Sequence, residues 1–185
     1  MTTTADRDRQ SRRRRAAVIF LFVLSFAVLG GYALLGGFKE PNMAVVTIPG
    51  YMLAGKEFEG RSGAPELNEI FNKAKELNST GQLPGTLAAI YYDAKEAEKG
   101  NVHTFAGVIV KDPIAQLPDG FVYRAVPAGK AVQAEIFAHY LVAPAPGRVQ
   151  LDLAGFARQN GLKPARFVIE KYFGPSNIVL EIPVK

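Results

Sequence analysis

The chain closes each of its halves with a similar stretch: Phe105-Ala106-Gly107-Val108-Ile109-Val110-Lys111 in the first and Val179-Leu180-Glu181-Ile182-Pro183-Val184-Lys185 in the second. Both are rich in residues that favour β-strands. Two shorter matches precede them: Ile-Pro-Gly at 48–50 with Val-Pro-Ala at 126–128, and Leu-Pro-Gly-Thr-Leu at 83–87 with Lys-Pro-Ala-Arg-Phe at 163–167. The offset of roughly 75–80 residues predicts a duplicated unit rather than a solenoid period.

Each half combines strands with one amphipathic helix. The first helix follows Pro65, which suits a first helical turn, and its apolar residues recur at helical spacing: Leu67, Ile70, Phe71, Ala74 and Leu77. The expected strands of this half are residues 43–48, continued by 51–58, then 86–93 and 103–111. The second half repeats the order, with strands at 121–126, 129–139, 165–173 and 177–185 and a helix at 148–160.

These patterns predict an α+β domain over residues 43–185, with repeats at about 43–111 and 120–185. We expect a duplicated strand-helix-strand-strand unit that forms an antiparallel sheet with two helices on one face. In this arrangement the other face of the sheet is free to curve round a ligand.

A long apolar segment precedes the domain. Four arginines occupy positions 12–15, and no charged residue follows until Lys39. Because about 20 apolar residues cross a bilayer core, residues 16–38 are predicted to form a transmembrane helix preceding the globular domain, after a disordered basic tail at 1–15. A cleaved secretory signal is the alternative. The positive-inside rule predicts a single-pass membrane protein with a cytoplasmic amino terminus and an extracytoplasmic domain.

Composition limits the function classes. The net charge of +5 is uneven: residues 1–38 hold six arginines against two aspartates, which leaves the remainder near neutral. We therefore expect no nucleic-acid partner, and the membrane as a partner instead. Cysteine is absent, and His103 and His139 are isolated, so no metal site is predicted. Gly-rich phosphate motifs and nucleophile elbows are also absent, which leaves neither a cofactor nor a catalytic residue to assign.

One carboxylate lies within an apolar strand. Alternation places Val168, Glu170 and Tyr172 on one face of the strand at 165–173. Burying a carboxylate is costly without a partner, so Glu170 is either half exposed, or paired with a neighbouring lysine or arginine, or part of a binding site. Glu181 is also within a strand, and we interpret it as a structural partner.

The domain resembles the gyrase-inhibitor-like small-molecule-binding domains. The resemblance spans residues 45–185 and rests on the duplication, on the segment FVYRAVPAG at 121–129, and on FVIEKY at 167–172 with LEIPV at 180–184. It implies a cleft between the repeats that binds amphipathic or cationic compounds, with Glu170 as the acidic residue among aromatic side chains. The DNA-binding helices of the related regulators are missing, as is tryptophan.

The predicted ligand-binding residues are Glu170, Tyr172, Tyr91, Phe105 and Tyr123. Aligning Pro84 with Pro164 makes Ile90 the counterpart of Glu170, so the site should hold one carboxylate. We interpret the protein as a non-enzymatic, membrane-anchored sensor of small hydrophobic or cationic ligands. Two alternatives stay open: a small hydrolase that uses Glu170, and a scaffold that recruits an unknown protein partner.

Overall fold

The sheet has an internal twofold symmetry. Its strand order is unchanged when it is read from the opposite end and each strand is replaced by its counterpart in the other repeat. The computed structural model describes residues 4–35, 41–92, 100–137, 146–174 and 177–185. Its elements are α1 (Thr4–Leu34), β1 (Asn42–Ile48), β2 (Tyr51–Arg61), α2 (Pro65–Ser79), β3 (Gly85–Tyr92), β4 (Asn101–Val110), β5 (Val122–Val126), β6 (Gly129–Ile136), α4 (Pro146–Gln159), β7 (Phe167–Tyr172) and β8 (Ile178–Val184).

The eight strands form one sheet in the order β1-β6-β8-β7-β3-β4-β2-β5, and every neighbouring pair is antiparallel. The α+β class, the antiparallel sheet and the duplication are thus as predicted. The repeating unit itself is larger than predicted, because it begins with two strands rather than one. The first strand of each repeat joins the other repeat: β1 pairs with β6, and β5 pairs with β2.

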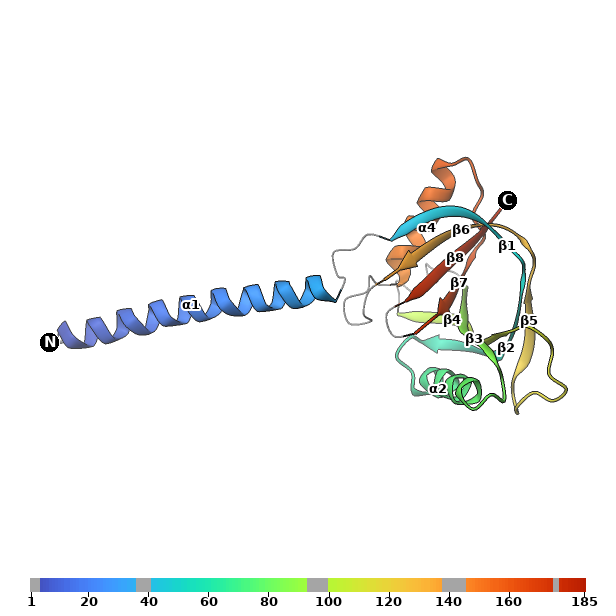
Figure 1. The fold of residues 1–185 in the computed structure, drawn as a ribbon, viewed down its shortest axis with the longest axis horizontal. Helices are drawn as coiled ribbons and strands as arrows, with labels where there is room; N and C mark the ends of the chain where they lie inside the picture. The colour runs from blue at the N-terminus through green and yellow to red at the C-terminus, as the bar shows by residue number, and fades with distance from the viewer. Residues whose placement is uncertain (1–3, 36–40, 93–99, 138–145, 175–176) are drawn as a thin grey trace.

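The sheet curls until its two ends meet (Figure 1). Only Pro49 and Gly50 separate β1 from β2, although β1 is the first strand of the sheet order and β2 is the last but one. The three Cα–Cα steps from Ile48 to Tyr51 span at most about 11 Å, so the two ends of the sheet must be close in space. A Cβ atom on Gly50 would lie 2.9 Å from the backbone nitrogen of Ala128, in the corresponding β5–β6 turn. The β1–β2 turn and the β5–β6 turn therefore lie against each other and close the sheet into a barrel-like shape.

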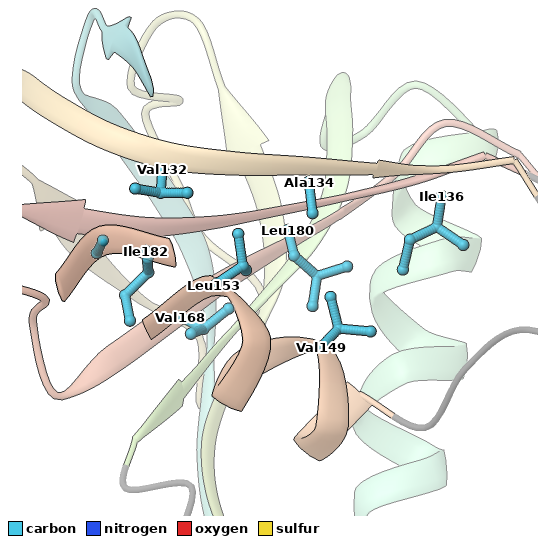
Figure 2. Packing of buried hydrophobic residues seen from close by; sticks show 9 residues of the cluster. Val132, Ala134, Ile136, Val149, Leu153, Val168, Leu180 and Ile182 are labelled. Atoms are coloured by element: carbon cyan, nitrogen blue, oxygen red, sulfur yellow. The ribbon is translucent and has the colours of Figure 1, made fainter. Parts of the chain in front are cut away.

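Both helices pack on the outer face of this curled sheet. Figure 2 shows Val149 and Leu153 of α4 directed toward sheet residues that include Val132 and Leu180. In the first repeat, α2 buries Leu67, Ile70, Ala74 and Leu77, four of the five residues expected to form its apolar stripe. The sequence prediction of two helices on one face is confirmed, since α2 packs on β2–β4 and α4 on β6 and β8.

The inner face is filled by the protein's own side chains. A cluster of buried residues occupies it: Ile48, Leu53, Ala88, Ile90, Phe105, Val126, Ala131 and Ile169. The prediction that this face would be free to enclose a ligand was therefore wrong. Closure of the sheet brings strands from both ends over the same interior, and the apolar residues of those strands fill it.

Helix α1 begins at Thr4, whereas the sequence predicted a disordered tail up to residue 15. Residues 5–29 contain neither proline nor glycine, so nothing in their backbone chemistry ends the helix there. In Figure 1, α1 extends away from the sheet. Within the described part of the chain, no helix has both the length and the apolar character required to cross a membrane.

Candidate functional site

The candidate site lies at the centre of the sheet, on the face that carries the helices. Alternation along β7 puts Val168 and Glu170 on one face, and Val168 belongs to the cluster packed under α4. Across the β3–β7 ladder, Glu170 pairs with Ala89, which belongs to a cluster packed under α2. Glu170 therefore lies on the sheet surface between the part covered by α2 and the part covered by α4.

The carboxyl group of Glu170 is buried and hydrogen-bonded to tyrosine. Glu170 is 3% exposed, and the Tyr172 hydroxyl donates a hydrogen bond of 2.7 Å to its Oε2. Burial raises the pKa of the Glu170 carboxyl above its ordinary value, while hydrogen bonding from Tyr172 and Tyr91 acts in the opposite direction. Among the described residues, no lysine or arginine forms an ion pair with Glu170. The hydrogen-bond donors that the described residues offer to this carboxyl are neutral.

Side chains from α2 and β3 complete the surroundings of the carboxyl. The Phe71 ring of α2 meets the Tyr172 ring edge-on, with centroids 6.1 Å apart. Burial raises the pKa values of the Tyr91 and Tyr172 hydroxyls, and the charge of Glu170 raises them further. Both hydroxyls therefore stay protonated near neutral pH and keep a proton to donate.

A pocket of about 450 Å³ opens beside this cluster, on the α4 side. Tyr91 lines it from β3, Val168 from β7, and Leu151 and Ala154 from α4. Tyr91 thus belongs both to the Glu170 cluster and to an open pocket wall. The pocket therefore reaches a tyrosine of the Glu170 cluster, whereas Glu170 itself is not part of the pocket wall.

The strand registers correct the alignment of the two repeats. The turns at 48–50 and 126–128 are 78 residues apart, so β6 corresponds to β2 at that offset. The registers of the β2–β4 and β6–β8 ladders then make each residue of β8 correspond to the residue of β4 that lies 74 positions earlier. With that offset, the registers of the β3–β4 and β7–β8 ladders make Ala89, not Ile90, the counterpart of Glu170 in the first repeat. A one-residue slip reverses the face of every side chain. The expectation of one carboxylate still holds.

The same offset makes Tyr91 and Tyr172 equivalent. Each follows the central residue of its strand by two positions, Ala89 in β3 and Glu170 in β7. The two tyrosines therefore approach the carboxyl from corresponding places in the two repeats. The structure brings together Glu170, Tyr172 and Tyr91, three of the five residues predicted for the site.

Phe105 and Tyr123 lie elsewhere, contrary to the predicted site. Phe105 is buried on the inner face, and the Arg124 guanidinium lies 5.1 Å from its ring centroid. Tyr123 is on edge strand β5, where its hydroxyl accepts from the Ile114 amide at 2.7 Å and donates to the Ile114 carbonyl at 3.2 Å. Both aromatic residues have structural roles that account for them.

A second polar cluster occupies the inner face, directly behind the first. Lys171 Nζ donates to Glu181 Oε1 over 2.5 Å, and Gln133 Nε2 donates to the same oxygen over 2.9 Å. Glu181 is 1% exposed, and its Oε2 has no hydrogen-bond partner among the described residues. The interpretation of Glu181 as a structural partner agrees with this pair. Sequence reasoning missed Lys171, although the two residues lie on the same face of adjacent strands.

A third cluster lies on the inner face at a more exposed position. Glu57 Oε1 lies 2.8 Å from His103 Nε2, and Glu57 Oε2 lies 3.1 Å from Arg124 Nη2. The hydrogen bond with His103 lowers the pKa of Glu57. All three side chains are about half exposed, which is typical of surface ion pairs that contribute little to stability. No described group of acidic or histidine residues has the geometry to hold a metal ion.

No protein-family model and no curated protein matches the chain. Solved structures do. The EcmrR C-terminal domain superposes with a TM-score of 0.59 at 16% identity, over 80% of this chain and 99% of that one. The chain shares the gyrase-inhibitor-like fold.

Two further solved structures share this fold. SAV2435 bound to tetraphenylphosphonium has a TM-score of 0.50 at 12% identity, over 80% of this chain and 94% of that one. A hydrolase from Listeria innocua has a TM-score of 0.53 at 10% identity, over 81% and 96%. At these identities the similarity establishes the gyrase-inhibitor-like fold alone.

Proposed function

We propose that the protein binds small amphipathic molecules with a cationic group next to Glu170, on the sheet face that carries α2 and α4. The observation that carries this proposal is a buried carboxyl surrounded by tyrosines, with no basic partner in the described chain. Desolvating a carboxylate is costly, and a ligand cation would offset that cost. The solved structure of SAV2435 with tetraphenylphosphonium has the same fold and supports this class of ligand.

The tyrosines give the site its selectivity in this proposal. The rings of Tyr91 and Tyr172 supply apolar area and cation–π attraction of about 0.5–2 kcal/mol, and their hydroxyls hold the carboxyl in place. The Phe71 edge adds a further apolar contact on the α2 side. A ligand therefore needs an apolar body together with its charge.

The test is a titration of wild type and Glu170→Gln with tetraphenylphosphonium and with a neutral compound of similar shape. We expect Glu170→Gln to weaken only the cation, by about 1.5–3 kcal/mol, as for a charge-assisted contact. Glu57→Gln is the matched control, because Glu57 is a half-exposed carboxylate on the opposite face. Equal loss for both compounds, or no loss for either, would contradict the proposal.

Hydrolysis of a reactive small molecule is the second candidate. A carboxyl whose pKa is raised by burial suits general acid–base chemistry, and a hydrolase from Listeria innocua has the same fold. Incubation of the purified protein with activated esters and epoxides tests this function. Turnover by wild type that disappears in Glu170→Gln would support it, whereas binding without turnover favours the binding function.

We also propose that residues 16–38 attach the chain to a membrane, with the domain on the extracytoplasmic side. What supports this is the uncharged run itself, the arginines at 12–15 before it, and the exposed apolar side chains of α1, such as Phe20 and Phe26. Separation of membrane and soluble fractions tests attachment. A reporter fused after Lys185 that is active only in the cytoplasm would contradict the orientation.

A further inference from the structure

The pocket beside α4 has a charge that the Glu170 cluster does not explain. Its walls are largely apolar: Leu151 and Ala154 from α4, Val168 from β7 and Ile182 from β8. A volume of about 450 Å³ is within the usual range for small-molecule sites. The pocket therefore suits the apolar part of an amphipathic compound.

Two arginines stand at the rim of this pocket. Arg158 is in the last turn of α4, and Arg166 immediately precedes β7. Both side chains are exposed, and neither forms an ion pair with any residue that the structure describes. The residues that line the pocket include no aspartate or glutamate. Its electrostatic preference is therefore for an anion.

The lining also contains neutral polar groups. Gln150 is buried on α4 and lines the pocket, and so does Tyr91. Guanidinium groups bind carboxylates through two parallel hydrogen bonds, and an amide can add a further donor. A ligand with one carboxylate at the rim and a hydrocarbon body against Leu151 would use each part of this lining.

We propose that this pocket binds amphipathic monocarboxylates, such as medium-chain fatty acids, with the carboxylate between Arg158 and Arg166. The carboxylate contacts different residues from the cation proposed for Glu170, so the two proposals can fail separately. The pocket shares Tyr91 with the Glu170 cluster, so a ligand in one site contacts a residue of the other.

The experiment compares octanoate, octyltrimethylammonium and octanol as ligands of the full chain by calorimetric titration. Octanoate should bind most tightly, and its affinity should fall with added salt because the rim is exposed to solvent. The double variant Arg158→Gln/Arg166→Gln should weaken octanoate about tenfold and leave octanol unchanged.

The matched control is Arg148→Gln/Lys130→Gln, which removes the same charge from exposed residues that do not line the pocket. This control should bind octanoate as wild type does. Equal weakening in both double variants would overturn the proposal, because general electrostatic attraction would then account for binding. Octyltrimethylammonium binding as tightly as octanoate would also overturn it. Glu170→Gln should bind octanoate as wild type does. Failure of the cation proposal at Glu170 can therefore be told apart from failure of this one.

Discussion

The Tyr172 hydroxyl donates to Glu170 Oε2 over 2.7 Å, in a place where the carboxyl has almost no access to water. Tyr172→Phe removes this donor and keeps the ring that meets Phe71. We expect a loss of about 1–3 kcal/mol in the free energy of unfolding, because a buried acceptor loses its partner. Urea unfolding near neutral pH measures it.

The control for this variant is Tyr92→Phe. Tyr92 is half-buried on the inner face, and no hydrogen bond of its hydroxyl occurs within the described chain. Its variant should unfold close to wild type. If the two variants lose the same stability, the bond between Tyr172 and Glu170 contributes nothing specific.

The pH dependence of stability should reveal Glu170. Burial raises the pKa of its carboxyl in the folded state above the unfolded value, so the folded state holds the proton to higher pH. The contribution of Glu170 therefore makes the protein less stable as pH rises from the unfolded pKa through the folded one. Glu170→Gln lacks this term and should gain stability relative to wild type over that window.

Glu57 should behave in the opposite way. The hydrogen bond with His103 lowers the pKa of Glu57, so its contribution is present above the unfolded pKa and is lost as pH falls through the folded one. Urea unfolding of wild type, Glu57→Gln and Glu170→Gln across the acidic range gives both slopes. The same sign for the two residues would refute the assignment of Glu170 as a desolvated carboxyl.

The Lys171–Glu181 pair should be costly to break from one side. Lys171→Met leaves the buried Glu181 carboxylate without its cation, for which we expect a loss of about 3–5 kcal/mol. The double variant Lys171→Met/Glu181→Leu should recover most of this loss, because both charges are gone. Thermal and urea unfolding measure the recovery. A double variant as unstable as the single one would show that packing, not charge, dominates.

Closure of the sheet depends on Gly50. Its φ is +86°, and a Cβ there would lie 2.9 Å from the Ala128 nitrogen. Gly50→Ala should therefore cost at least about 1–2 kcal/mol of stability. Gly129→Ala is the comparison, since a Cβ at Gly129 meets no atom within 4 Å. Equal stability of the two variants, measured by urea unfolding, would contradict a tight contact between the turns.

Local patterns predicted most of the fold but not how the repeats combine. The apolar spacing behind Pro65 and the alternation of residues 167–172 correctly placed α2 and β7. The exchange of β1 and β5 between repeats was missed, because each strand pairs with a distant segment and carries no local sign of its partner. That exchange closes the sheet, which is why the inner face is filled.

The site was predictable only as far as strand alternation reaches. Glu170 and Tyr172 share a strand, so their common face followed from spacing alone. Tyr91 and Phe105 were both included only as aromatic residues that could line a cleft. Separating them required the register of β3 against β4 and β7, which the sequence does not give. The one-residue error at Ile90 has the same origin: a loop before β7 that differs in length from its counterpart.

The pairing of Ala89 with Glu170 has a consequence for how such a protein could arise. In a dimer of identical single repeats, the residues facing each other at this point would be the same, either two alanines or two glutamates. Two neighbouring carboxyls in a buried position would repel each other or share a proton, and two alanines would offer no charge at all. Joining both repeats in one chain lets a small residue and an acid occupy related positions, so covalent fusion is what permits a single buried charge in an otherwise symmetric fold.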